Sequence, residues 1–300
     1  MVSHLLAVWI ALQTPAPPDP LLEPALRRLS EEAEVFAFKA AKAVGEETLQ
    51  QRALRPPPRF RPRIGKAALE APPPRYQTRE IVSEYGFSAF QEAPGILHEF
   101  RQVVSVDGRK LAHPEKALKI LVMGVRSADD KLKNKMLRDF EKYGLHGAAM
   151  DFGPLLHLFT RRELAGFTFT PGGTSLIGAD SARAIQYRQS AQPGSFTIFR
   201  DRQAVRVPLE GVIWVRESDH LPLRITLAAA TEQDNKRVSY EAIVDYQLSS
   251  HGVLLPASVV FKETVEGQMT VENVFRYASF KMFTVDAEIK FTAEDPPPPK

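Results

Sequence analysis

A series of strand-like segments fills the second half of this chain and constrains its fold more than any other feature. Between residues 167 and 280 apolar and polar side chains alternate within short segments. In the segment 221–230 one face carries Leu221, Leu223, Ile225, Leu227 and Ala229. A period of two places such residues on one side of a β-strand. The pattern predicts an antiparallel meander with one buried and one exposed face.

The same alternation occurs earlier in the chain. We predict strands near residues 79–87, 97–106, 167–170, 182–189, 196–199, 204–207, 211–217, 221–230, 237–248, 253–263 and 268–280. A long amphipathic sheet needs a cover for its apolar face. Helical spacing of apolar residues over 20–44 and 127–143 supplies one. The predicted fold class is therefore α+β: a curved antiparallel β-sheet, or incomplete β-barrel, wrapped around or covered by helices.

Three segments in all are interpreted as helical. Residues 19–54 show apolar positions at steps of three and four, with Gly45 as an interruption and 46–54 as a weaker continuation. A capping residue, Ser127, begins the helix that runs to about Tyr143, and a short helix is expected near 154–163. We therefore expect a helical insertion at 127–163.

An arm rich in proline and arginine separates the first helix from the sheet. The chain has 39 Lys and Arg against 36 Asp and Glu, a net charge of +3. Residues 52–79 alone carry +7, which leaves −4 for the remainder. Proline removes the hydrogen-bond donors that helices and inner strands need, so this arm should be extended. The arm either contacts an anionic membrane surface or an envelope polymer, through Arg55, Arg59, Arg61 and Arg63, or is a plain solvated linker.

The N-terminus indicates export. Residues 5–12 form one apolar run, too short to cross a bilayer as a helix but of the length found in secretory signals. We predict a signal peptide at 1–13 and a periplasmic or otherwise exported protein. The chain has no cysteine, so disulfides and thiolate chemistry are excluded. The small total charge argues against a nucleic-acid partner.

The search for catalytic motifs finds two fragments. His98-Glu99 begins like a zinc-protease helix, but it lies in a predicted strand and lacks the second histidine. Asp151-Phe152-Gly153 matches a kinase triplet without the other kinase motifs. We therefore predict no catalytic residue, no metal and no cofactor, and a protein that is not an enzyme.

The order of motifs after residue 200 resembles a known family. Gly211-Val212-Ile213-Trp214-Val215 is followed by a turn and Leu221-Pro222-Leu223-Arg224, then by the tyrosine-containing strand Val244-Asp245-Tyr246 and a closing strand that ends at 277–283. Over residues 200–283 this resembles the outer-membrane lipoprotein carrier (LolA/LolB-like) superfamily of bacterial envelope proteins. The resemblance implies an incomplete β-barrel that closes over helices and leaves an apolar cavity for acyl chains.

These observations give a domain plan: a signal peptide at 1–13, an N-terminal helical segment at 14–54, a Pro/Arg-rich linker arm at 55–75, a carrier-like half-barrel domain at 76–285 and a Pro-rich tail at 286–300. The expected function is exported, non-enzymatic binding of lipid or lipoprotein acyl chains. The alternative is an envelope scaffold that binds through its arm and has a solid β-core. Alternation does not separate a hollow barrel from a filled one. The predicted cavity residues are Trp214, Leu223, Ile225, Leu227, Tyr240, Val244, Tyr246, Val259, Phe261, Val271, Phe275 and Tyr277.

Overall fold

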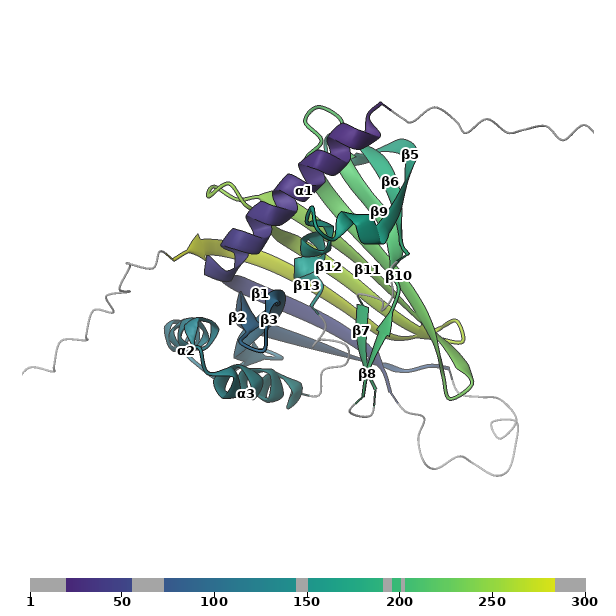
Figure 1. The fold of residues 1–300 in the computed structure, drawn as a ribbon. Helices are drawn as coiled ribbons and strands as arrows, with labels where there is room; N and C mark the ends of the chain where they lie inside the picture. The colour runs from purple at the N-terminus through teal and green to yellow at the C-terminus, as the bar shows by residue number, and fades with distance from the viewer. Residues whose placement is uncertain (1–19, 56–72, 144–150, 191–195, 201–202, 284–300) are drawn as a thin grey trace, which may run out of the picture.

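A curved antiparallel sheet of 11 strands dominates the computed structural model, in the order β4-β3-β2-β1-β13-β12-β11-β10-β9-β6-β5. The structure describes residues 20–55, 73–143, 151–190, 196–200 and 203–283. The two outer strands, β4 and β5, do not pair with each other, so the barrel is incomplete (Figure 1). The predicted α+β fold class is confirmed.

The strands follow the predicted meander closely. Their bounds are β1 (Ala43–Leu54), β2 (Tyr76–Phe90), β3 (Ala93–Val106), β4 (Arg109–Lys110), β5 (Phe167–Ile177), β6 (Asp180–Gln189), β9 (Glu210–Arg216), β10 (Pro222–Gln233), β11 (Lys236–Leu248), β12 (Leu254–Val265) and β13 (Gln268–Met282). The strands β7 (Phe196–Arg200) and β8 (Gln203–Val207) form a separate hairpin.

Helix α1 (Leu22–Lys39) crosses the concave face of the sheet. Its buried side carries Leu29, Ala33 and Phe36, at the spacing that brings residues of successive turns to one face. Phe36 packs edge-on against Phe87 of β2, with ring centroids 5.5 Å apart. The expectation that this helix covers the apolar side of the sheet is confirmed. None of the helices in the described ranges is long and apolar enough to span a bilayer.

The predicted helical continuation over 46–54 is wrong. A short 3-10 turn (Ala40–Lys42) ends the helix, and the chain then forms β1 at the centre of the sheet, between β2 and β13. Along β1 the inward positions include Glu47 and Gln51 as well as Leu49. Polar residues at inward positions removed the alternation by which a strand is recognised.

A helical layer packs against β2 and β3, on the side of Phe100. It consists of α2 (Pro114–Arg126) and α3 (Asp130–Glu141). The predicted helix after Ser127 is confirmed as α3, whose first turn is capped by Asp129 through the N–H of Lys131. Helix α2 was not predicted, although Pro114 at its first turn is a common helix start. The helical part of the chain thus begins before the predicted insertion.

Residues 151–166, called the strap below, run from the edge of β3 to the start of β5. They contain the 3-10 helices η3 (Gly153–Phe159) and η4 (Leu164–Gly166) in place of the helix expected at 154–163. Leu155, Leu156 and Phe159 of the strap are buried. The strap contacts α1 and β12, so the strap and α1 together cover the concave face.

Candidate functional site

The concave face of the sheet collects eleven of the twelve predicted cavity residues. All eleven are buried, and ten of them, all except Leu223, belong to one contiguous apolar cluster. They come from β10 to β13, where the inward residues align across strands, as Val244 does with Ile225 and Val259. The prediction that these strands share one apolar face is confirmed. Whether any of these side chains contacts a lipid stays a prediction.

Trp214 lies on the other face of the sheet. In β9 its neighbours Ile213 and Val215 are buried, whereas Trp214 is half-buried. Trp214 aligns with Arg224 of β10, which points away from the concave side. This corrects its predicted placement, because the alternation along β9 puts the odd-numbered residues inside.

The middle of the concave face is filled by the chain itself. Phe152 of the strap stacks on Phe261 of β12, with ring centroids 4.7 Å apart. The Tyr246 hydroxyl donates to the Gly153 carbonyl oxygen at 3.0 Å and accepts from the Leu156 N–H at 2.9 Å. Phe159 packs edge-on against Tyr187 of β6 at 5.0 Å. Strap and sheet are therefore joined by both rings and hydrogen bonds.

At one end of the sheet the cover stops and a cleft of about 700 Å³ opens. It lies where β9 begins, at Glu210 opposite Ala228, while β10 continues to Gln233 without β9 beside it. The small side chains of Ala228, Ala229 and Ala230 leave this space open. The residues that line the cleft are Arg188, Gln189, Pro208, Leu209, Glu210, Ala228, Ala229, Ala230, Arg237, Ser239, Tyr240, Glu241, Thr264 and Gly267.

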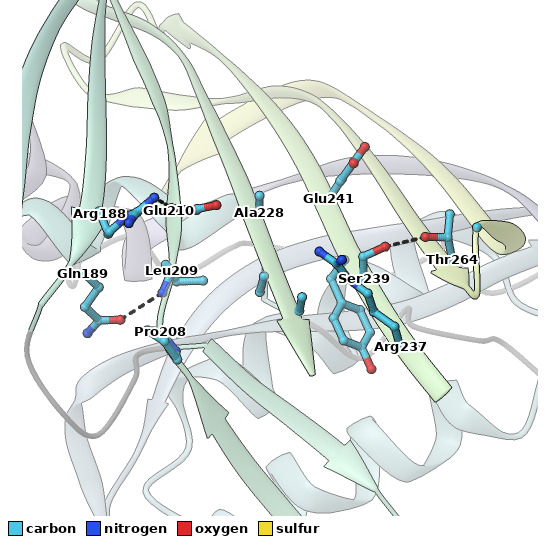
Figure 2. Close-up of a pocket in the computed structure, with 14 residues that line it drawn as sticks. Arg188, Gln189, Pro208, Leu209, Glu210, Ala228, Arg237, Ser239, Glu241 and Thr264 are labelled. Carbon is cyan, nitrogen blue, oxygen red and sulfur yellow. Dashed lines mark hydrogen bonds and ion pairs between the residues drawn. The ribbon is translucent and has the colours of Figure 1, made fainter. Parts of the chain in front are cut away.

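Figure 2 shows these residues on neighbouring strands. By the alternation along β10 and β11, Ala228, Ser239 and Glu241 lie on the outer face of the sheet, whereas Ala229 and Tyr240 are buried on the concave face. Arg188 pairs with Glu210 at 2.8 Å, and both side chains are largely exposed. The Gln189 side-chain oxygen accepts from the Leu209 N–H at 3.3 Å. Tyr240 is the one predicted cavity residue that lines this cleft. The remaining lining residues were missed because alternation marks buried positions and not the place where a neighbouring strand begins.

A buried ionic network was also missed by the sequence analysis. The Arg101 guanidinium donates to both carboxylate oxygens of Glu47, at 2.7 and 2.9 Å, and to Glu99 at 2.7 Å. All three side chains are almost completely buried. The rings of Tyr85, Phe140 and Phe275 surround the guanidinium, at 5.2 to 5.4 Å from ring centroid to carbon.

The same network fastens the strap to β3. One Glu99 oxygen accepts from the Tyr85 hydroxyl at 2.6 Å and from the Gly153 N–H at 2.8 Å. Asp151 accepts from the Glu99 N–H at 2.7 Å and lies 2.7 Å from Nδ1 of His98. The sequence analysis rejected two fragments as catalytic motifs, His98-Glu99 and Asp151-Phe152-Gly153. In the structure these two fragments meet and form a structural junction.

Burial sets the ionisation of this junction. It raises the pKa of the Glu99 carboxyl, and the charges of Asp151 and Glu47 raise it further, while Arg101 acts in the opposite direction. Burial also raises the pKa of Tyr85 well above its usual value. Burial therefore disfavours the ionised form of Glu99, and the donors around its carboxyl group favour it. Among the described residues, no group of three or more acidic or histidine side chains converges as a metal site.

The arm leaves the sheet as a connection between two paired strands. Arg55 follows β1, and its N–H donates to the carbonyl oxygen of Arg75, just before β2, at 2.8 Å. The arm is thus an excursion of the β1–β2 hairpin rather than a linker from helix to sheet. Arg55 is exposed, and the other predicted anion-contact residues, Arg59, Arg61 and Arg63, lie outside the described residues.

Comparison with known proteins gives similarity at the level of structure. No protein-family model and no curated protein matches the chain. The chain is similar to an outer membrane lipoprotein-sorting protein domain from Vibrio parahaemolyticus, at 9% identity and a TM-score of 0.31, over 89% of this chain and 95% of that one. It is also similar to a LolA superfamily protein from Nitrosomonas europaea, at 8% identity and a TM-score of 0.31, over 87% and 94%.

A third similar structure is a DUF1329 family protein from Desulfovibrio piger, at 8% identity and a TM-score of 0.35, over 90% of this chain and 94% of that one. The likeness to LolA-superfamily proteins expected from the sequence is therefore also found by structure comparison. What this protein binds has to be argued from its own side chains.

Proposed function

We propose that this protein is an exported, non-enzymatic binding protein of the bacterial envelope that holds an acyl chain of a lipid or lipoprotein. The observation that carries the proposal is the cleft of about 700 Å³ near the β10–β11 turn, whose lining includes residues from both faces of these strands. Its size is within the roughly 300–1,000 Å³ of small-molecule sites. Leu209, Ala229 and Tyr240 supply an apolar wall beneath a polar rim.

The chemistry of such binding requires no reactive group. Each methylene removed from water contributes about 0.8 kcal/mol, so a chain of several carbons is held by burial alone. The charged groups of the rim, Arg188 and Arg237, lie where the polar end of an amphiphile would emerge. The acyl chain would lie in the cleft, against the filled core, without displacing the strap.

The disposition of the ionisable groups supports binding rather than catalysis. In the buried network the hydrogen bonds of Glu99 and Arg101 go to other groups of the protein. An active site instead brings perturbed groups together in a cavity open to substrate. The cleft lies at the strand ends lined by Ala228 and Thr264, whereas the network is beneath the strap.

The proposal is tested by closing the cleft. Ala228→Phe places a ring at the half-buried lining of the cleft and should abolish uptake of a fluorescent fatty acid while the melting temperature stays within a few degrees of wild type. Ala278→Phe, on the exposed side of β13, is the matched control and should bind as wild type does. Equal uptake by all three proteins would refute the cleft as the site. Mass spectrometry of lipid extracted from the purified protein would identify the natural chain.

The alternative is a scaffold with a solid core that binds through its arm. The filled centre of the concave face favours it, because α1 and the strap already cover the residues from Val244 to Phe275. Replacing Arg55, Arg59, Arg61 and Arg63 by Ser would then abolish retention on anionic liposomes, while the Ala228→Phe variant would retain it. Retention of this arm variant equal to that of wild type would make the arm a plain linker.

A further inference from the structure

The helical layer of α2 and α3 carries two stripes of positive charge. Along α2, Lys116, Lys119, Met123 and Arg126 recur at steps of three and four and are exposed. Along α3, Lys131, Lys135, Arg138 and Lys142 recur in the same way and are also exposed. At 3.6 residues per turn each set lies on one side of its helix.

Both stripes point away from the sheet. The opposite side of α2 buries Ala117, Leu121 and Val125, and the opposite side of α3 buries Met136 and Phe140. The two helices touch where a Cβ added to Gly124 would lie 2.2 Å from the Met136 sulfur. Figure 1 shows α2 and α3 next to each other beside β2 and β3. The exposed sides of the two helices together are called the basic face below.

The charge of this region is strongly one-sided. Residues 109–142 contain ten Lys and Arg against five Asp and Glu, a net charge of +5 in a chain whose total is +3. Three of the five acidic side chains have partners within this region, and one of them, Asp139, pairs with Lys142 of the α3 stripe. Asp129 caps α3, and Asp130 accepts from the N–H of Gln91 and pairs with Lys133. The basic face is therefore a cationic surface that lies apart from the arm in the sequence.

Exposed apolar side chains accompany these charges. Met123, between Lys119 and Arg126, is 60% exposed, and Leu111, just before α2, is 43% exposed. A nucleic acid or an acidic polymer would gain little from such side chains, whereas a bilayer takes them into its interfacial region. Lysine stems can lie along the same boundary with their ammonium groups at the lipid phosphates.

We propose that the basic face docks this protein on an anionic lipid bilayer, with Met123 entering the interface and the stripes of α2 and α3 contacting the headgroups. The attraction of each Lys or Arg near an anionic leaflet is additive to a first approximation, and it is screened over ~8 Å at physiological salt. This docking surface is independent of the cleft, because the cleft is lined from β6 and the segment 207–210 to β13 and not by the helical layer.

The test is vesicle co-sedimentation of the full chain with phosphatidylglycerol–phosphatidylcholine vesicles and with pure phosphatidylcholine vesicles. The variant neutralises Lys116, Lys119, Lys131 and Lys135 to Gln, a good helix former, so the layer should fold. We expect its partition onto the anionic vesicles to fall at least about tenfold. Met123→Ser should reduce it a few-fold at unchanged charge.

The matched control neutralises four exposed cations elsewhere, Arg162, Lys236, Arg276 and Lys281, to Gln and should partition as wild type does. Melting curves establish that the variants are folded. The proposal is overturned if the basic-face variant partitions like the control, if the arm variant alone accounts for binding, or if duplex DNA competes and vesicles do not bind. Fatty-acid uptake by the basic-face variant should be unchanged.

Discussion

Strands β10 and β11 pass through two different environments. In their middle, Ile225 and Val244 face each other across the strands and are completely buried under α1 and the strap. Toward the β10–β11 turn, Ala229 and Tyr240 also face each other and are buried, but here they belong to the lining of a cleft. The alternation of apolar residues is the same in both places. What differs is the cover, which comes from segments distant in the sequence.

The comparison shows that an amphipathic strand specifies a buried face and not what buries it. Under the strap, Phe152 and Phe159 occupy the space that a ligand would need. Beyond the strap, small alanines and the late start of β9 leave that space open. The filled centre of the concave face and the end near the β10–β11 turn are therefore parts of one continuous apolar cluster.

The largest expected effect comes from the network that joins the strap to the sheet. Arg101→Ala leaves the carboxylates of Glu47 and Glu99 buried without their cation and should cost about 3–5 kcal/mol of unfolding free energy. Arg224→Ala, which breaks a partly exposed pair with Asp245, is the control and should cost about 1 kcal/mol or less. Urea denaturation measures both. If both variants lose a similarly small amount of unfolding free energy, the Arg101 network does not hold the strap on the sheet.

A smaller effect tests the filling itself. Ile225→Phe adds volume to a close-packed region and should cost about 1–3 kcal/mol. Ile243→Phe, on β11 but 38% exposed on the other face, should change stability by less than about 0.5 kcal/mol. If Ile225→Phe is tolerated as well as Ile243→Phe, the centre contains unfilled space and the predicted cavity extends through it.

The pH dependence of the junction gives the smallest effect. Because the pKa of Glu99 is raised in the folded protein, its contribution to stability is full below the unfolded pKa near 4.5 and is lost as the pH rises through the folded pKa. The unfolding free energy of wild type minus that of Glu99→Gln should therefore decrease from pH 4 upward. A difference that stays constant or increases with pH would show that Glu99 is not in a dry environment.

The sequence predicted the parts of the fold that depend on local pattern. The strands β9 to β13 and the helices α1 and α3 were recognised because their apolar residues keep the expected period. The sequence predicts a helix in place of strand β1, because the polar residues Glu47 and Gln51 occupy inward positions and remove the alternation typical of a strand. Their partners, Arg101 and Asn273, are distant in the chain, so nothing near β1 marks these polar residues as buried.

The candidate site was predicted less completely for a related reason. The buried face from Leu223 to Tyr277 followed from alternation, but the cleft depends on where β9 begins relative to β10. Such a stagger is a property of the sheet and not of one segment. The strap was unpredictable because Gly153 and Leu156 are held by the hydroxyl of Tyr246, on a strand far along the chain.

The most direct test of the proposed site is photo-crosslinking with a diazirine-bearing fatty acid, followed by peptide mapping. A chain held in the open end should label β10 and β11 around Ala228, Ala229, Ala230 and Tyr240, together with Leu209. The filled centre, represented by Phe152, Phe261 and Val244, should remain unlabelled. Labelling of Phe261 and Val244 instead would contradict the account, because the acyl chain would then replace the strap beneath α1.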